Sequence, residues 1–109
     1  MNRVTTRPSK AHVRVFFGDE VIADTRAAVE LHESARAVVY YIQREDVRMD
    51  RLERSSHRTH CPFKGDASYF SVAGGPENAV WSYEAPYDEM LAIRERLAFY
   101  PDKFRIESH

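Results

Sequence analysis

The residues best suited to chemistry lie in one segment near the middle of the chain, residues 55–69. It contains the only cysteine, Cys61, together with His57, His60 and Lys64, in a chain whose other cations are mostly arginines. Thiols, imidazoles and amines act as nucleophiles, general bases and anion-binding groups in proteins. A functional site, if the chain has one, is therefore expected here.

The order Pro-Phe-Lys-Gly in this segment predicts a turn. Pro62 favours an extended backbone at Cys61, and Gly65 is suited to a positive φ. We expect Cys61 to end one strand and Lys64 to stand at the apex of the turn. Because side chains alternate along a strand, one face would carry three of the segment's residues and the opposite face two: His57, Thr59 and Cys61 against Arg58 and His60.

Two interpretations of Cys61 stay open. In the first, it is a partly accessible, reactive or ligand-binding thiol at the floor of a cup walled by His57, Tyr69 and Trp81, and the Lys64 ammonium favours its anionic form. In the second, it fills space in the core, as single cysteines commonly do. Lys64 itself is either a solvated charge at the turn or a group that binds a carboxylate or phosphate.

Other chemistries have weaker support. His57, His60 and Cys61 are ligand types for zinc, but strand geometry divides them between two faces and no second cysteine exists. We therefore predict no metal and no cofactor. Gly74-Gly75 lacks the spacing of a phosphate loop, and the chain has no Gly-x-Ser-x-Gly sequence. The acids expected to pair with Arg58 or Lys64 are Asp46, Glu84 and Asp66.

The elements that must position this segment are mostly strands. Apolar and polar residues alternate on both sides of Gly18, and residues 37–42 form a continuous apolar run typical of a central strand. Residues 26–33 fit a helical turn or an irregular strand equally well. Further strands are expected at 47–51, 69–72, 80–83 and 103–106.

One helix is expected, from Pro86 to Phe99, with Met90, Ile93 and Leu97 on its apolar stripe. The predicted fold class is therefore mainly β: a compact antiparallel, tent-like or barrel-like sheet domain of about seven or eight strands with one C-terminal helix.

Composition limits the function classes. The chain has 109 residues, of which 43% are hydrophobic and 30% charged, as expected for one globular domain over residues 11–109 after a mobile or tucked N-terminal arm at 1–10. A formal net charge of -1 argues against a nucleic-acid partner. No apolar run is long enough to cross a membrane, and the single cysteine and the absence of an apolar leader favour the cytoplasm.

The stretch Arg58-Thr59-His60-Cys61-Pro62-Phe63-Lys64-Gly65-Asp66-Ala67-Ser68-Tyr69 closely resembles the signature Thr-x-Cys-Pro-aromatic-Lys-Gly-x-Ala-x-Tyr of a bacterial and fungal family catalogued as domain of unknown function 427. The resemblance extends from Val13 to Ile106, and Gln43 departs from it where the family often has proline. Other matching positions are Gly18, Ala23-Asp24-Thr25, Tyr41, Asp46-Val47, Trp81-Ser82-Tyr83-Glu84-Ala85-Pro86 and Phe99-Tyr100-Pro101.

The resemblance implies a mainly β domain similar to the tent-like sheets of methionine sulfoxide reductase B relatives, without their zinc. The family has also been labelled nucleotidyltransferase, which no motif of this chain supports. The matching side chains able to contact a ligand are Thr59, Cys61, Lys64 and Tyr69.

Two functions are carried forward. The first is a small-molecule site, binding or catalytic, with Cys61 and Lys64 as the candidate catalytic residues. Its ligand-binding residues would be His57, Thr59, Cys61, Lys64, Tyr69 and Trp81. The second is a non-catalytic structural or interaction domain in which the Cys-Pro-Phe-Lys-Gly turn has only a structural role. A homodimer through an exposed strand edge or aromatic face is also expected.

Overall fold

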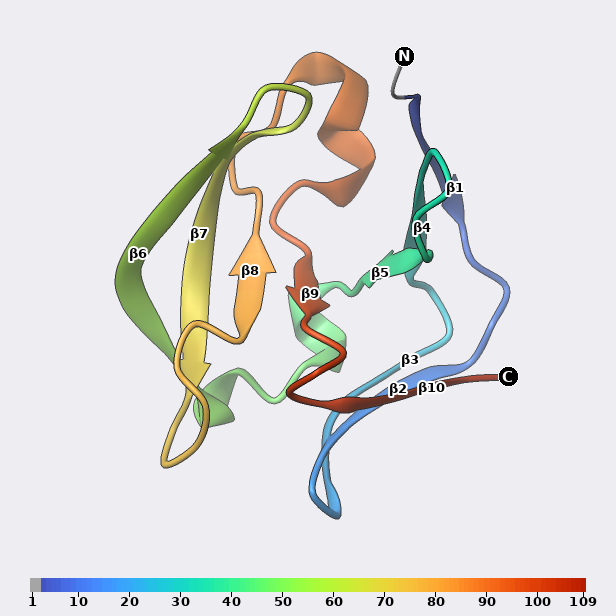
Figure 1. Cartoon of the computed structure of the whole chain (residues 1–109). Coiled ribbons are helices and arrows are strands. Elements are labelled where there is room, and N and C mark those ends of the chain that lie inside the picture. Colours follow the sequence, from blue (N-terminus) through green and yellow to red (C-terminus); the bar gives the residue numbers. More distant parts are fainter. Residues whose placement is uncertain (1–2) are drawn as a thin grey trace.

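A computed structural model describes residues 3–109, and strands dominate it (Figure 1). The described residues form ten strands and three short 3₁₀ helices. In chain order these are β1 (Val4–Pro8), β2 (Val13–Phe17), β3 (Glu20–Thr25), β4 (Val29–Glu33), β5 (Val39–Tyr41), η1 (Arg44–Asp46), η2 (Met49–Arg51), β6 (Leu52–Cys61), β7 (Gly65–Val72), β8 (Val80–Ser82), η3 (Asp88–Ile93), β9 (Leu97–Phe99) and β10 (Arg105–Ser108).

The strands form three antiparallel sheets. Their strand orders are β1-β4-β5, β10-β2-β3 and β6-β7-β8-β9. A single bridge between Ile42 and Leu97 joins the β5 side of the first sheet to the β9 side of the third. The predicted mainly β, antiparallel class is therefore confirmed, with ten described strands in place of seven or eight.

The core follows from the alternation in the strands. On β2 the side chains of Val13 and Val15 are 0% and 1% exposed, whereas Arg14 between them is half-buried. They pack in the larger cluster of buried residues, and a second cluster forms around Tyr41, Tyr69 and other rings. Burying each such side chain contributes roughly 1.5 to 3 kcal/mol, so these two clusters hold the sheets together.

The predicted helix from Pro86 to Phe99 is wrong. Only Asp88–Ile93 is helical, as the 3₁₀ helix η3, and the backbone leaves helical angles within it at Met90. Glu95 then has a φ of 62°, and Leu97–Phe99 forms β9, paired with β8. The apolar residues do recur at helical spacing. However, a short helix is only marginally stable, and the backbone of residues 97–99 forms its hydrogen bonds with a neighbouring strand instead.

Three further segments, at residues 1–10, 26–33 and 47–51, either differ from the predicted structure or resolve an open alternative. Residues Met1 and Asn2 of the expected arm lie outside the described residues, and Val4–Pro8 pairs with β4 as β1, which corresponds to the tucked alternative. The open segment 26–33 contains the strand β4. The strand expected at 47–51 is replaced by η2, and β6 begins directly after it.

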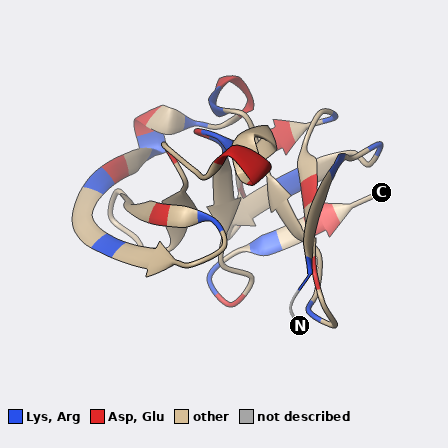
Figure 2. Cartoon of the chain, turned by 90° about the horizontal axis from the view of Figure 1, so that it is seen from above, with Lys and Arg blue, Asp and Glu red and all other residues tan. Residues whose placement is uncertain are grey.

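Charges of both signs are distributed over the same elements, as the view from above shows (Figure 2). Residues 3–109 include no helix long and apolar enough to span a membrane. The surface therefore carries positive and negative charges side by side. The candidate site lies between the first and third sheets.

Candidate functional site

The hairpin between β6 and β7 places the chemically interesting segment. β6 ends at Cys61, β7 begins at Gly65, and Gly65 has a φ of 111°, so the predicted turn is confirmed. The amide of Lys64 donates to the carbonyl of Cys61 at 3.2 Å, and the carbonyl of Lys64 accepts from the amide of Tyr87 at 3.1 Å. The backbone at Lys64 is therefore held from both sides.

The side chain of Lys64 points inward. Although it comes from a turn, Lys64 is only 8% exposed. Its Nζ donates to Oε1 of Glu33 on β4 at 3.1 Å and lies 3.6 Å from Sγ of Cys61. Of the two interpretations of Lys64, the structure excludes the solvated charge, and the ion pair joins the third sheet to the first.

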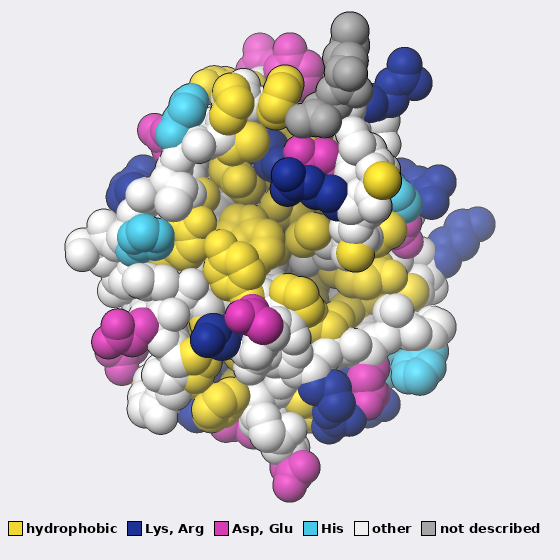
Figure 3. All heavy atoms as spheres, viewed as in Figure 1, with side chains coloured by type: hydrophobic (Ala, Val, Ile, Leu, Met, Phe, Trp, Pro, Cys, Tyr) yellow, Lys and Arg dark blue, Asp and Glu magenta, His cyan; other side chains and the backbone are white. Residues whose placement is uncertain are grey.

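A cavity of about 280 Å³ lies at this junction. The space-filling view shows a hollow with hydrophobic side chains at its centre, between the β6–β7 side and the β4–β5 side (Figure 3). Its walls combine five aromatic rings with three charged groups and a few aliphatic side chains. The lining residues are Leu31, Glu33, Arg36, Ala37, Val39, Tyr41, Lys64, Tyr69, Trp81, Tyr83 and Tyr100.

The aromatic walls are held by contacts among themselves. Nε1 of Trp81 donates to the hydroxyl of Tyr41 at 3.1 Å, and the Trp81 ring lies 4.5 Å from that of Tyr100, centroid to centroid. The hydroxyls of Tyr69 and Tyr100 are 3.4 Å apart. Such fixed rings form a preorganised apolar surface with polar edges, as ligand sites commonly do.

Three phenols of the cavity have a raised pKa and are kept protonated. Burial raises the pKa of Tyr41 and of Tyr83 far above the usual value, and burial together with the Tyr69 hydroxyl raises that of Tyr100 to about 12. Among residues 3–109 the hydroxyl of Tyr83 has no hydrogen-bond partner, although Tyr83 is only 7% exposed. The cavity therefore offers neutral hydrogen-bond donors beside the Lys64 ammonium.

Three of the predicted ligand-binding residues line the cavity, namely Lys64, Tyr69 and Trp81. The other three stand behind them. Oγ1 of Thr59 is 2.9 Å from the Tyr69 hydroxyl, the His57 ring lies 4.6 Å from the Tyr69 ring, and half-buried Cys61 contacts Lys64. The shared face predicted for these three residues is confirmed, but Lys64 lies at the cavity wall where Cys61 was expected.

His60, on the opposite face of β6, has a different partner. His60 Nδ1 is 2.7 Å from Asp66 Oδ1 at the surface, which separates it from Cys61 and His57. No three His, Cys, Asp or Glu side chains within residues 3–109 gather closely enough to hold a metal ion.

Glu33, Arg36 and Tyr100 are cavity residues that the site prediction missed. A signal for Glu33 existed, because a strand reading of residues 29–33 places it on the same face as Val29 and Leu31. Tyr100 appeared only among the positions of the family resemblance. Nothing in the local sequence marks Arg36, since it lies in the exposed connection between β4 and β5.

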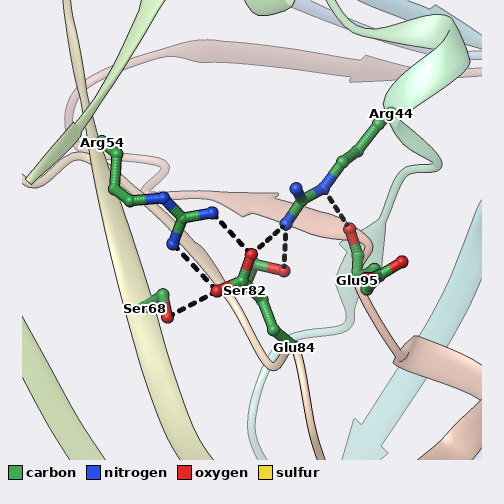
Figure 4. A network of polar contacts seen from close by, with 6 residues as sticks. All are labelled: Arg44, Arg54, Ser68, Ser82, Glu84 and Glu95. Atoms are coloured by element: carbon green, nitrogen blue, oxygen red, sulfur yellow. Dashed lines mark hydrogen bonds and ion pairs between the residues drawn. The ribbon is translucent and has the colours of Figure 1, made fainter.

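Glu84 does not pair with Lys64 or Arg58, contrary to expectation. Its carboxylate accepts from Arg54 at 2.7 and 2.9 Å, from Arg44 at 2.9 Å and from the hydroxyl of Ser68 at 2.8 Å (Figure 4). These hydrogen bonds hold the pKa of Glu84 far below its usual value. The network ties η1 to β6 and β7, and its saturated geometry gives it a structural role separate from the cavity.

Comparison with known proteins agrees with the sequence resemblance. No curated protein matches the chain. The family model described as "Domain of unknown function (DUF427)" matches residues 5–109, which include every strand of the cavity and the whole β6–β7 hairpin. The chain therefore belongs to the DUF427 family.

Proposed function

We propose that this domain binds a small molecule in the cavity between β4–β5 and β7–β8. The observation that carries the proposal is the Lys64 ammonium, buried at a turn and facing a space walled by aromatic rings. Burying an ammonium costs several kcal/mol unless it is paired, and a turn apex would normally leave it in water. Here Glu33 supplies the pairing. Glu33 and Cys61 accept from two of the three N–H donors of the ammonium, and a ligand in the cavity would accept from the third.

The charges favour a ligand with a negative charge or hydrogen-bond acceptors. Glu33 balances Lys64, while Arg36 at the exposed connection adds a second positive charge without an ion-pair partner among the described residues. The Tyr83 hydroxyl supplies a further donor. A carboxylate or similar group beside Lys64, with its apolar part against the rings, would use all of these groups.

Binding, rather than a reaction, is the function proposed. Cys61 is the only thiol, and its Sγ lies behind the Lys64 ammonium instead of on the cavity wall. We therefore place Lys64 and Tyr83 as ligand-binding residues, and Cys61 as a group that contacts one of them.

Trp81 provides the test, because it is the only tryptophan and stands in the cavity wall. Benzoate, butyrate, imidazole and inorganic phosphate are titrated while its fluorescence is followed, with amide NMR shifts to locate binding. We expect an acid to bind in the cavity, and Tyr83→Phe and Lys64→Met to weaken it. Tyr87→Phe, at a 43% exposed tyrosine outside the cavity, is the matched control for Tyr83→Phe.

The alternative is the structural domain, in which the Lys64–Glu33 pair only joins two sheets. It would be supported if none of the four probes shifted cavity resonances, or if probes bound equally well to Lys64→Met and Tyr83→Phe proteins that remain folded. Either result would remove the binding proposal.

A homodimer in the cytoplasm is proposed for the assembled protein. β6 is an edge strand of ten residues, most of them exposed, so its free backbone edge could pair with a second copy. An unpaired Cys61 suits a reducing compartment. Light scattering that returned the monomer mass of 12.7 kDa at high concentration would contradict the dimer.

A further inference from the structure

A second cavity of about 220 Å³ lies beside the first, on the other face of β5. Its inner wall is formed by the buried side chains of Val15, Ile42 and Phe99, and the more exposed Val38 and Ile106 also line it. Within residues 3–109, no charged side chain lines it. It is therefore an apolar space next to a polar and aromatic one.

Ala37, Val39 and Trp81 line both cavities, so the two spaces adjoin at these three residues. The alternation along β5 explains this arrangement, because Tyr41 lines the first cavity whereas Tyr40 and Ile42 line the second. A molecule seated against Lys64 would therefore have the apolar space directly beside it, at Trp81 and Val39.

The chemical contrast between the two spaces is sharp. All three charged residues, Lys64, Glu33 and Arg36, line the first cavity. Water in the second cavity would find few hydrogen-bond partners, so placing methylene groups there is favourable. A ligand that filled both spaces would need a polar, negatively charged end and an apolar chain.

We propose that the ligand is an anionic amphiphile, a medium-chain carboxylate. This inference rests on the proposed function, since it assigns the head group to the Lys64 cavity. The carboxylate lies beside Lys64 and the Tyr83 hydroxyl, and the chain passes along Trp81 and Val39 into the second cavity. Val38 is 38% exposed and lines only the second cavity, so a change at Val38 tests the position of the ligand's hydrocarbon chain alone.

The test compares butyrate, hexanoate and octanoate with the wild-type protein. Affinity is measured from Trp81 fluorescence, and the methyl NMR signals of Val38 and Ile106 locate the chain. Each methylene that enters the apolar cavity is expected to strengthen binding about fourfold, the factor that corresponds to about 0.8 kcal/mol per buried methylene. Octanol, which has the same chain length and no charge, tests the head group and is expected to bind at least tenfold more weakly.

Val38→Trp is the variant that separates the ligand's apolar chain from its head group; because it and its control each add a second tryptophan, their affinities are measured from the methyl NMR signals of Ile106 instead of from fluorescence. The indole ring is larger than the valine side chain and is expected to fill the second cavity. It should reduce the affinity for octanoate toward that for butyrate and leave butyrate binding unchanged. Val21→Trp is the matched control, because Val21 is 37% exposed and lines neither cavity. Thermal unfolding of both variants confirms that they remain folded.

The outcomes distinguish this inference from the proposed function. If all three acids bind with equal affinity, and Val38→Trp has no effect, the amphiphile is wrong while a small-molecule site at Lys64 stands. If octanol binds as tightly as octanoate, the anionic head group is wrong. If Tyr83→Phe and folded Lys64→Met leave every affinity unchanged, the proposed function itself fails.

Discussion

Lys64 and Glu33 meet across two sheets, with Nζ 3.1 Å from Oε1 and both side chains nearly buried, at 10% and 13% exposed. They are separated by 31 positions in the chain, and each is held by its own element, the β6–β7 turn and the end of β4. The pair therefore sets the distance between the sheets at the cavity.

Removing one member of this pair is expected to destabilise the fold. Glu33→Gln or Lys64→Met leaves the partner charge buried without its counterion, which we expect to lower the free energy of unfolding by about 2 to 4 kcal/mol. Urea unfolding of each variant measures the loss.

The double variant is the control for that prediction. Glu33→Gln with Lys64→Met removes both charges, so it should be less destabilised than the sum of the two single changes. Additive losses would mean that the two side chains do not interact in solution.

Cys61 is expected to react with iodoacetamide in the native protein, because its thiol is only partly buried. Nζ of Lys64 lies 3.6 Å from Sγ, and a neighbouring cation generally speeds the reactions of a thiol, so Lys64→Met should slow alkylation. Lys64→Arg keeps the charge and should restore part of the rate. Mass spectrometry of the labelled protein follows the reaction.

A sealed thiol would give a different pattern. Alkylation would then occur only as the protein unfolds, and Cys61→Ala would cost about 1 kcal/mol of stability, as a typical point substitution does. That pattern would favour the core interpretation of Cys61.

Alkaline pH is expected to destabilise the protein through its buried tyrosines. The pKa values of Tyr41, Tyr83 and Tyr100 are raised above the ordinary tyrosine value of 10.0, so the unfolded chain releases these protons at lower pH than the folded one. Their contribution to stability is complete below pH 10.0 and is lost as the pH rises above it. Tyrosinate absorbance and unfolding midpoints, measured together, should show this loss, and Tyr83→Phe should reduce it.

Acid should act through Glu84. Its pKa is lowered mainly by hydrogen bonds from Arg54, so its stabilising effect is present above the ordinary glutamate value of 4.5 and is lost as the pH falls below it. Glu84→Gln is expected to cost roughly 2 kcal/mol at neutral pH, since it breaks charge-assisted hydrogen bonds, and less in acid.

Glu53→Gln provides the comparison for Glu84→Gln. Glu53 is an exposed carboxylate on β6 and belongs to none of the described ion pairs. Its replacement should leave the acid limb of the stability curve unchanged. Equal pH dependence in the two variants would contradict the role assigned to the Glu84 network.

Features that depend only on residues close together along the chain could be predicted from the sequence. Pro62 and Gly65 restrict the backbone locally, so the turn between β6 and β7 and the end of a strand at Cys61 could be predicted from residue types. On β2 the alternation likewise predicted that Val13 and Val15 would be buried, but beyond the register shift between Val15 and Phe16 it is Phe16 that is buried and Phe17 that is half-buried. The family signature added the identity of the domain, which no physical pattern in the chain provides.

The places where those local elements meet depend on packing between segments that are far apart along the chain. The spacing of Met90, Ile93 and Leu97 is helical, yet Leu97–Phe99 pairs with β8, because a partner strand was available to satisfy its backbone. The burial of Lys64 likewise depends on distant parts of the chain. A lysine at a turn would remain in water if Glu33 and the aromatic rings did not approach it from distant strands, and only the packing of the first sheet against the third brings them there.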